Sequence, residues 1–94
     1  MELEQERIRG ERARQILEDP MVRDALDAIE AETIAKWEMT PARDTEAREK
    51  LWMFYVVSKK FRNTLKETMD TGKMAAIQLS EKQSLATKVA SMWR

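Results

Sequence analysis

Residues 44–72 carry the feature that most restricts the fold of this chain, a continuous helical pattern of apolar and small residues. One face of that helix recurs at steps of three and four, at Ala47, Leu51, Phe54, Ser58, Phe61, Leu65, Thr68 and Gly72. Such a helix would be roughly 40 Å long, more than the radius of a globule of 94 residues. The rest of so short a chain cannot surround it, so we expect a partner helix and further subunits.

Composition favours a helical protein that gains stability by association. The chain has no Cys and no His, which excludes disulfides and thiolate or imidazole metal sites. A chain of this size buries little surface by itself, so oligomerisation is the remaining way to supplement its core. Two Gly and two Pro provide too few turns for a β-rich fold. The N-terminus lacks the pattern of a signal peptide, and the longest apolar block, residues 51–57, is too short to span a membrane.

The predicted fold is all-α, with residues 1–94 forming one helical domain. Residues 1–18 form a charged arm, which we expect to be helical only if something packs on it; a frayed terminus is the alternative. Asp19 caps a helix that begins at Pro20 and ends near Met39. A short loop around Pro41 then leads to the long helix, which Asp44 or Thr45 caps. Residues 20–72 therefore make a long antiparallel hairpin, and residues 73–94 a C-terminal amphipathic segment.

The shorter helix of this hairpin should bury one stripe and expose its acids. The buried stripe comprises Val22, Leu26, Ile29, Thr33, Lys36 and Trp37, and the acids expected to face outward are Asp24, Asp27, Glu30 and Glu32. Four carboxylates on a helix can hold two metal ions. Because these acids surround the apolar stripe and no ExxH motif is present, a solvated face is the better interpretation, and no metal or other cofactor is expected.

The candidate interface is aromatic. Trp52, Tyr55, Val56 and Val57 widen the apolar surface of the long helix, and the short loop should bring Trp37 close to Trp52 and Tyr55. Such a cluster is more often core or protein interface than a ligand site. The interface residues predicted on this basis are Trp37, Leu51, Trp52, Phe54, Tyr55, Phe61, Leu65 and Trp93.

The C-terminal part leaves alternatives open. Gly72 either ends the long helix or marks a tight contact within a continued one. Ser80 with Gln83 forms a capping box, which predicts a last helix over residues 81–93 with an apolar stripe of Leu85, Val89, Met92 and Trp93. Trp93 is either disordered or an anchor for a partner groove.

Charge separates the two halves of the chain. Residues 1–49 hold 14 acids and 8 bases, and residues 50–94 hold 3 acids and 9 bases, so the balances are −6 and +6. This polarity is most simply explained by attraction between the protein's own helices, within or between chains. The alternative is an acidic partner such as nucleic acid, which would meet the bases predicted to be exposed on the long helix: Lys59, Lys60, Arg62, Lys66 and Lys73.

Residues 11–79 resemble small phage-encoded proteins of head-assembly and DNA-packaging gene clusters. The resemblance lies in ERARQILEDPMVRDALDAIEAETIAKW, in TPARDTEAREKLW and in GKMAAIQL. It implies a virion or assembly context, hence the host cytoplasm during assembly or the virion, with other virion or packaging proteins as partners. It carries over no catalytic residue.

Three functions fit these observations. The first is a non-enzymatic structural or assembly protein that forms a homo-oligomeric helical module. The second is a DNA-packaging oligomer similar to a terminase small subunit, although the acidic N-terminal half speaks against DNA recognition there. The third is a small regulator that binds a host protein through its Trp-rich surface. An enzyme is not expected, because no nucleophile-base pair and no Gly-rich loop is present.

Overall fold

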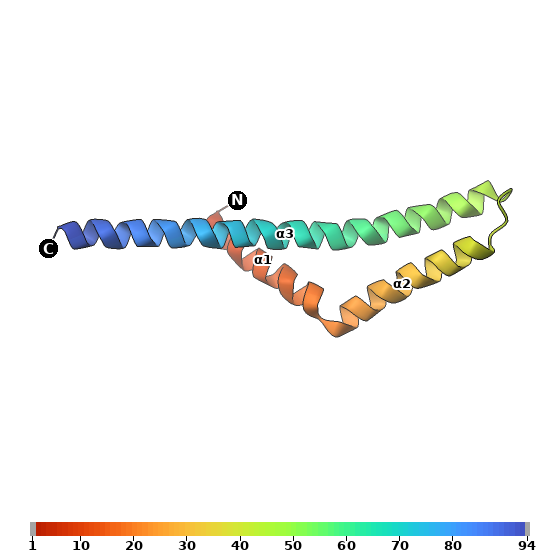
Figure 1. Ribbon diagram of the computed structural model, residues 1–94, viewed down its shortest axis with the longest axis horizontal. Helices are drawn as coiled ribbons and strands as arrows, with labels where there is room; N and C mark the ends of the chain where they lie inside the picture. Colours follow the sequence, from red (N-terminus) through yellow and green to blue (C-terminus); the bar gives the residue numbers. More distant parts are fainter. Residues whose placement is uncertain (1, 94) are drawn as a thin grey trace. The chain divides into compact units, whose positions relative to one another are not determined.

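A computed structural model describes residues 2–93 of the chain, and in this range it is all-helical. It contains three α-helices and no strand over these residues: α1 (Leu3–Glu18), α2 (Pro20–Met39) and α3 (Thr45–Met92) (Figure 1). The chain divides into two compact units. One comprises residues 1–15 and 66–94, and the other comprises residues 16–65.

Local sequence signals set the ends of α2 and the start of α3. The Asp19 carboxylate accepts hydrogen bonds from the backbone N–H groups of Met21 (2.8 Å) and Val22 (3.2 Å), and Pro20 is the first helical residue. Asp44 caps α3 in the same way, with its carboxylate 3.2 Å from the Ala47 nitrogen. The predicted bounds of α2 and the capped start of α3 are therefore confirmed.

In the unit of residues 1–15 and 66–94, α1 crosses α3 at two glycines (Figure 1). A Cβ atom added to Gly10 would lie 2.5 Å from the Cα of Gly72, and one added to Gly72 would lie 2.6 Å from the Cα of Gly10. Beside this crossing, Ala13 and Ala75 are 2% and 1% exposed. Small residues thus let the two backbones touch. The arm is helical, and Gly72 is the contact within a continued helix, which was one of the two alternatives.

The predicted helix start at Ser80 is wrong. Residues 80–92 continue α3 without a break, because no residue there interrupts the i to i−4 hydrogen bonding of the helix. Every residue from 80 to 93 is exposed. Leu85, Val89 and Met92 nevertheless form a stripe at helical spacing, as the sequence indicates.

In the unit of residues 16–65, α2 and the first part of α3 lie against each other. Their contacts run in opposite directions along the two helices: Thr40 meets Arg48 near the loop, and Asp27 meets Arg62 farther from it. The least exposed residues of this part of α3 recur at steps of four and three, at Leu51, Tyr55, Ser58, Arg62 and Leu65. This is the 3.5-residue period of a coiled-coil seam.

The face of α3 that meets α2 shares Leu51, Ser58 and Leu65 with the predicted stripe, but Tyr55 and Arg62 replace Phe54 and Phe61 on it. Phe54 and Phe61 are 64% and 49% exposed, and on α2 three residues of the predicted buried stripe are exposed as well: Ile29, Lys36 and Trp37. Thr33 and Ser58 are the buried residues of the contact. The most buried residues of the seam are thus polar, while Phe54 and Phe61 lie outside it.

Candidate protein-interaction surfaces

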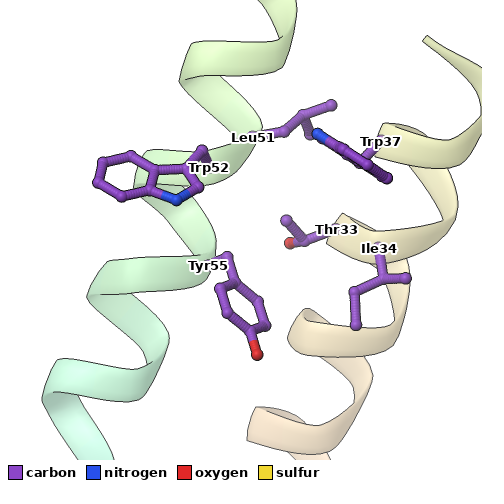
Figure 2. A pocket seen from close by; sticks show the side chains of 6 residues that line it. All are labelled: Thr33, Ile34, Trp37, Leu51, Trp52 and Tyr55. Atoms are coloured by element: carbon purple, nitrogen blue, oxygen red, sulfur yellow. The ribbon is translucent and has the colours of Figure 1, made fainter.

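An apolar groove lies between α2 and α3 near the loop. It has a volume of about 260 Å³ and is lined by Thr33, Ile34, Trp37, Leu51, Trp52 and Tyr55. Figure 2 shows Leu51 and Tyr55 reaching from α3 towards Trp37, Thr33 and Ile34 of α2. In the same view, the Trp52 ring points away from Trp37. The structure therefore brings four of the predicted interface residues to one groove, without stacking the two tryptophans.

Arg48 holds the loop end of this groove. Its guanidinium carbon lies 4.2 Å from the centre of the Trp37 ring, and its Nη1 atom donates a hydrogen bond of 3.0 Å to the carbonyl of Thr40. A cation over an indole is attracted by the ring's quadrupole. Arg48 thereby joins the start of α3 to the end of α2 and fixes one wall of the groove. Nothing in the sequence pattern singled out this residue.

A polar cluster lies at the middle of the same contact. The Glu30 carboxylate accepts hydrogen bonds from Ser58 Oγ (3.3 Å), Lys59 Nζ (3.5 Å) and Arg62 Nε (3.1 Å). Arg62 also donates from Nη2 to Asp27 at 2.6 Å. This hydrogen bond to Asp27 is the main reason why the pKa of the Arg62 guanidinium lies above its ordinary value, and the charge of Glu30 adds to it. Hydrogen bonds between charged side chains therefore join α2 and α3 at the middle of their contact.

The cluster corrects two predictions. Glu30 was expected to face outward, but it pairs with α3 and its side chain is only 17% exposed. Asp27 also pairs with Arg62, yet its side chain stays 68% exposed, as expected. Arg62 was predicted to be an exposed base, but its side chain is 26% exposed and is directed at α2. The reason is that Arg62 takes the place of Phe61 on the face of α3 that meets α2. Once Ser58 and Arg62 point at α2, an acid at position 30 becomes their partner.

A second apolar surface lies on another face of α3. Met53, Phe54, Val57 and Phe61 are all exposed, and we call these four residues the phenylalanine face. Lys50, Met53, Phe54 and Val57 line a shallow apolar depression on it. The sequence pattern named Phe54 and Phe61 among the predicted interface residues. Met53 was missed, although it lies four residues before Val57.

The remaining predicted interface and nucleic-acid residues do not gather at one site. Leu65 is half-buried at the end of the α2 contact, and Trp93 is 86% exposed at the end of the described chain. Lys59, Lys60 and Lys66 are exposed, but Lys59 is shared between Glu30 and the Tyr55 ring, whose centre is 5.4 Å from its Nζ atom. Because Lys59 and Arg62 pair with Glu30, the five bases predicted to be exposed do not form one free basic row.

Chemically, these surfaces suit contact with apolar side chains. Over residues 2–93, no group of three or more acids is arranged to hold a metal ion. In the same range, no helix is both long and apolar enough to cross a membrane. The two surfaces are instead apolar and aromatic, with charged residues at their margins. No protein family model matches the sequence, and neither a curated protein nor a solved structure matches it.

Proposed function

We propose that this chain is a non-enzymatic assembly module that forms homo-oligomers through its helices. One observation carries the proposal. Over residues 2–93 the buried positions are Gly10, Ala13, Thr33, Ser58, Gly72 and Ala75, whereas eighteen large hydrophobic side chains are exposed. Burial of large apolar side chains is the main favourable term in folding. Because this chain leaves most of its large apolar side chains exposed, other helices would stabilise it by covering these side chains.

The hairpin is the part that would present these surfaces. In this proposal, residues 20–39 and 44–72 act as an antiparallel hairpin whose polar seam aligns the helices, while the groove and the phenylalanine face remain for partners. A polar seam contributes orientation more than affinity. The exposed apolar faces would then supply the affinity, because large exposed patches mark interaction sites.

The virion context of the proposal rests on the resemblance of residues 11–79 to phage assembly proteins. A module that associates with copies of itself and with other virion or packaging proteins suits that context. The absence of Cys and His from the sequence leaves few groups for nucleophilic or acid-base catalysis, which favours a structural role.

The first prediction concerns mass in solution. The wild-type protein should have a mass well above the 11.0 kDa of one chain at micromolar concentration, measured by light scattering and by sedimentation equilibrium. Trp52 is 62% exposed in one chain, so Trp52→Ala should leave its helix content intact. It should weaken association by about 2 kcal/mol, the cost of losing an aromatic anchor.

Asn63→Ala is the matched control, because Asn63 is exposed on the same helix and belongs to neither surface. It should leave the mass unchanged. A monodisperse wild type of 11.0 kDa with a sharp melting transition would remove the proposal for the isolated chain.

The second prediction separates assembly from DNA binding. Because Lys59 and Arg62 already pair with Glu30, duplex DNA should bind weakly even at low salt. A triple variant with Glu at positions 59, 60 and 66 should weaken assembly rather than abolish a tight DNA complex. Tight binding whose affinity falls with a slope of about −0.9 per phosphate contact, and which the triple variant loses without a change in mass, would favour the packaging role instead.

A further inference from the structure

The phenylalanine face is an apolar surface of residues 16–65 that the chain itself leaves uncovered. Phe54 and Val57 are each 64% exposed, and Met53 and Phe61 are exposed as well. The depression on this face is bordered by apolar side chains and the stem of Lys50. Phe54, Val57 and Phe61 follow each other at steps of three and four, so they form one straight row along α3.

The bases beside this row are Lys50 and Lys60, and Lys50 already pairs with Glu46 at 3.4 Å. Lys59 and Arg62 lie on the side of α3 that meets α2, where they pair with its acids. Apolar side chains thus make up most of the face, which favours another apolar helix face over a polyanion.

We infer that a second copy of this chain covers the phenylalanine face, with the two α3 helices crossing antiparallel about a two-fold axis near Val57. The inference rests on the proposed self-association and specifies its contact. In such an isologous interface the same patch is used on both copies.

The row is nearly symmetric about Val57, as a two-fold contact requires. Phe54 lies three residues before it and Phe61 four residues after it, which correspond to about 4.5 and 6 Å along the helix. An antiparallel crossing therefore places Phe54 of each copy opposite Phe61 of the other. The two Val57 side chains then meet at the axis.

Charge selects the antiparallel direction over the parallel one. A parallel pairing in register would put Lys50 beside Lys50 and Lys60 beside Lys60 of the second copy, which is unfavourable for like charges. The antiparallel crossing places Lys50 opposite the neutral region around Thr64. It also separates the two Lys50 residues by about 14 residues of helix, or about 21 Å.

The area is sufficient for a specific contact. From their exposed fractions, the four side chains of the face present about 500 Å² per copy. A symmetric pair would bury about 1,000 Å², which reaches the lower bound for specific protein interfaces. A contact of this size is weak by itself, so the groove between α2 and α3 remains available for further assembly.

Single cysteines test the inference, because the natural chain contains none. Val57→Cys should form a disulfide-linked dimer under mild oxidation, since the two positions meet at the axis. Phe54→Cys alone should not, because its two copies would be offset by about 10 Å, beyond the reach of a disulfide. A mixture of Phe54→Cys and Phe61→Cys chains should give the mixed dimer.

Asn63→Cys, exposed on another side of α3, is the control and should stay monomeric on denaturing gels. In a second measurement, Phe54→Ser combined with Phe61→Ser should raise the dissociation constant of self-association about tenfold or more, while Asn63→Ser leaves it unchanged. Circular dichroism checks that each variant keeps its helix content.

Four outcomes would overturn the inference. Cross-linking of Phe54→Cys with itself would mean a parallel pair. A cross-link between Val57→Cys and Val89→Cys chains would mean that the C-terminal segment covers the face. Failure of Val57→Cys to cross-link in a wild-type-like oligomer would assign the face to a different partner and leave the proposed self-association intact. An 11.0 kDa wild type would instead remove the proposed function together with the inference.

Discussion

Gly72→Ala is expected to release α1 from α3, although it improves the helix-forming tendency of α3. In an exposed helix position, alanine stabilises by about 1 kcal/mol relative to glycine. Here the added Cβ would lie 2.6 Å from the Cα of Gly10 and 3.0 Å from the carbonyl oxygen of Glu6. Ordinary carbon contacts need about 3.5–4.0 Å, so the two backbones must move apart by about 1 Å. A loss of stability in Gly72→Ala, in place of the gain expected for an exposed helix position, would therefore show that α1 and α3 touch here.

The separation should loosen the packing of Ala13 and Ala75, and overpacking of this kind costs about 1–3 kcal/mol. Thermal unfolding followed by circular dichroism should show a lower midpoint. Trypsin should also cut faster after the arginines of α1, which are Arg7, Arg9, Arg12 and Arg14. Both changes follow from the same cause, a helix that has lost its packing surface.

Thr71→Ala is the control, since Thr71 is exposed beside Gly72 and a change to alanine there adds no backbone contact. Gly10→Ala should act like Gly72→Ala. The double variant should cost less than the sum of the two, because the first substitution has already opened the crossing. If Gly72→Ala melts at a higher temperature than the wild type, α1 is not packed at this crossing.

Glu30→Ala is expected to cause the second large loss of stability, in the contact between α2 and α3. It removes the common acceptor of Ser58, Lys59 and Arg62. Removal of one partner from a buried ion pair costs about 3–5 kcal/mol. Because Glu30 and Arg62 keep some exposure and Asp27 still accepts from Arg62, we expect about 2 kcal/mol here. Denaturant unfolding followed by circular dichroism measures the loss.

Glu32→Ala is the matched control on the same helix. Glu32 is exposed and pairs locally with Lys36 at 2.8 Å, and a contact between two exposed side chains contributes little to stability. The hydrogen bond from Lys36 holds the pKa of Glu32 below its ordinary value, but the exposure of the pair keeps its effect on stability small. A double-mutant cycle of Glu30→Ala with Arg62→Ala should show coupling. Equal losses for Glu30→Ala and Glu32→Ala would refute the role of the polar cluster.

Features controlled by neighbouring residues were predicted from the sequence. Asp19 and Pro20 act within one turn, so the start of α2 could be recognised without any tertiary information. The same holds for the loop around Pro41, for the cap at Asp44 and for the all-helical class. The capping box at Ser80 is the exception. Its residues favour a helix start, but they are equally compatible with a helix interior, and α3 simply continues through them.

Part of the candidate site could also be predicted from the sequence. Trp37, Leu51, Trp52 and Tyr55 were expected near one another because a short loop joins their helices, and they line one groove. Ile34 and Thr33 complete that groove and were not assigned to it. Their place depends on how far each helix is rotated about its own axis, which the apolar pattern alone does not specify.

Local signals in the sequence are enough to show that this protein is helical and where its capped helices begin. The apolar pattern also predicts more apolar surface on the long helix than so short a chain can cover. Which face of α3 meets α2 depends instead on contacts between the helices. Phe54 and Tyr55 are adjacent and both aromatic, so local pattern cannot choose between them, whereas the pairing of Glu30 with Arg62 can. Gly72 is likewise a helix end or a crossing depending on Gly10, which is remote in sequence. In both cases the deciding interaction is long-range, and its energy depends on geometry that forms only when the helices meet.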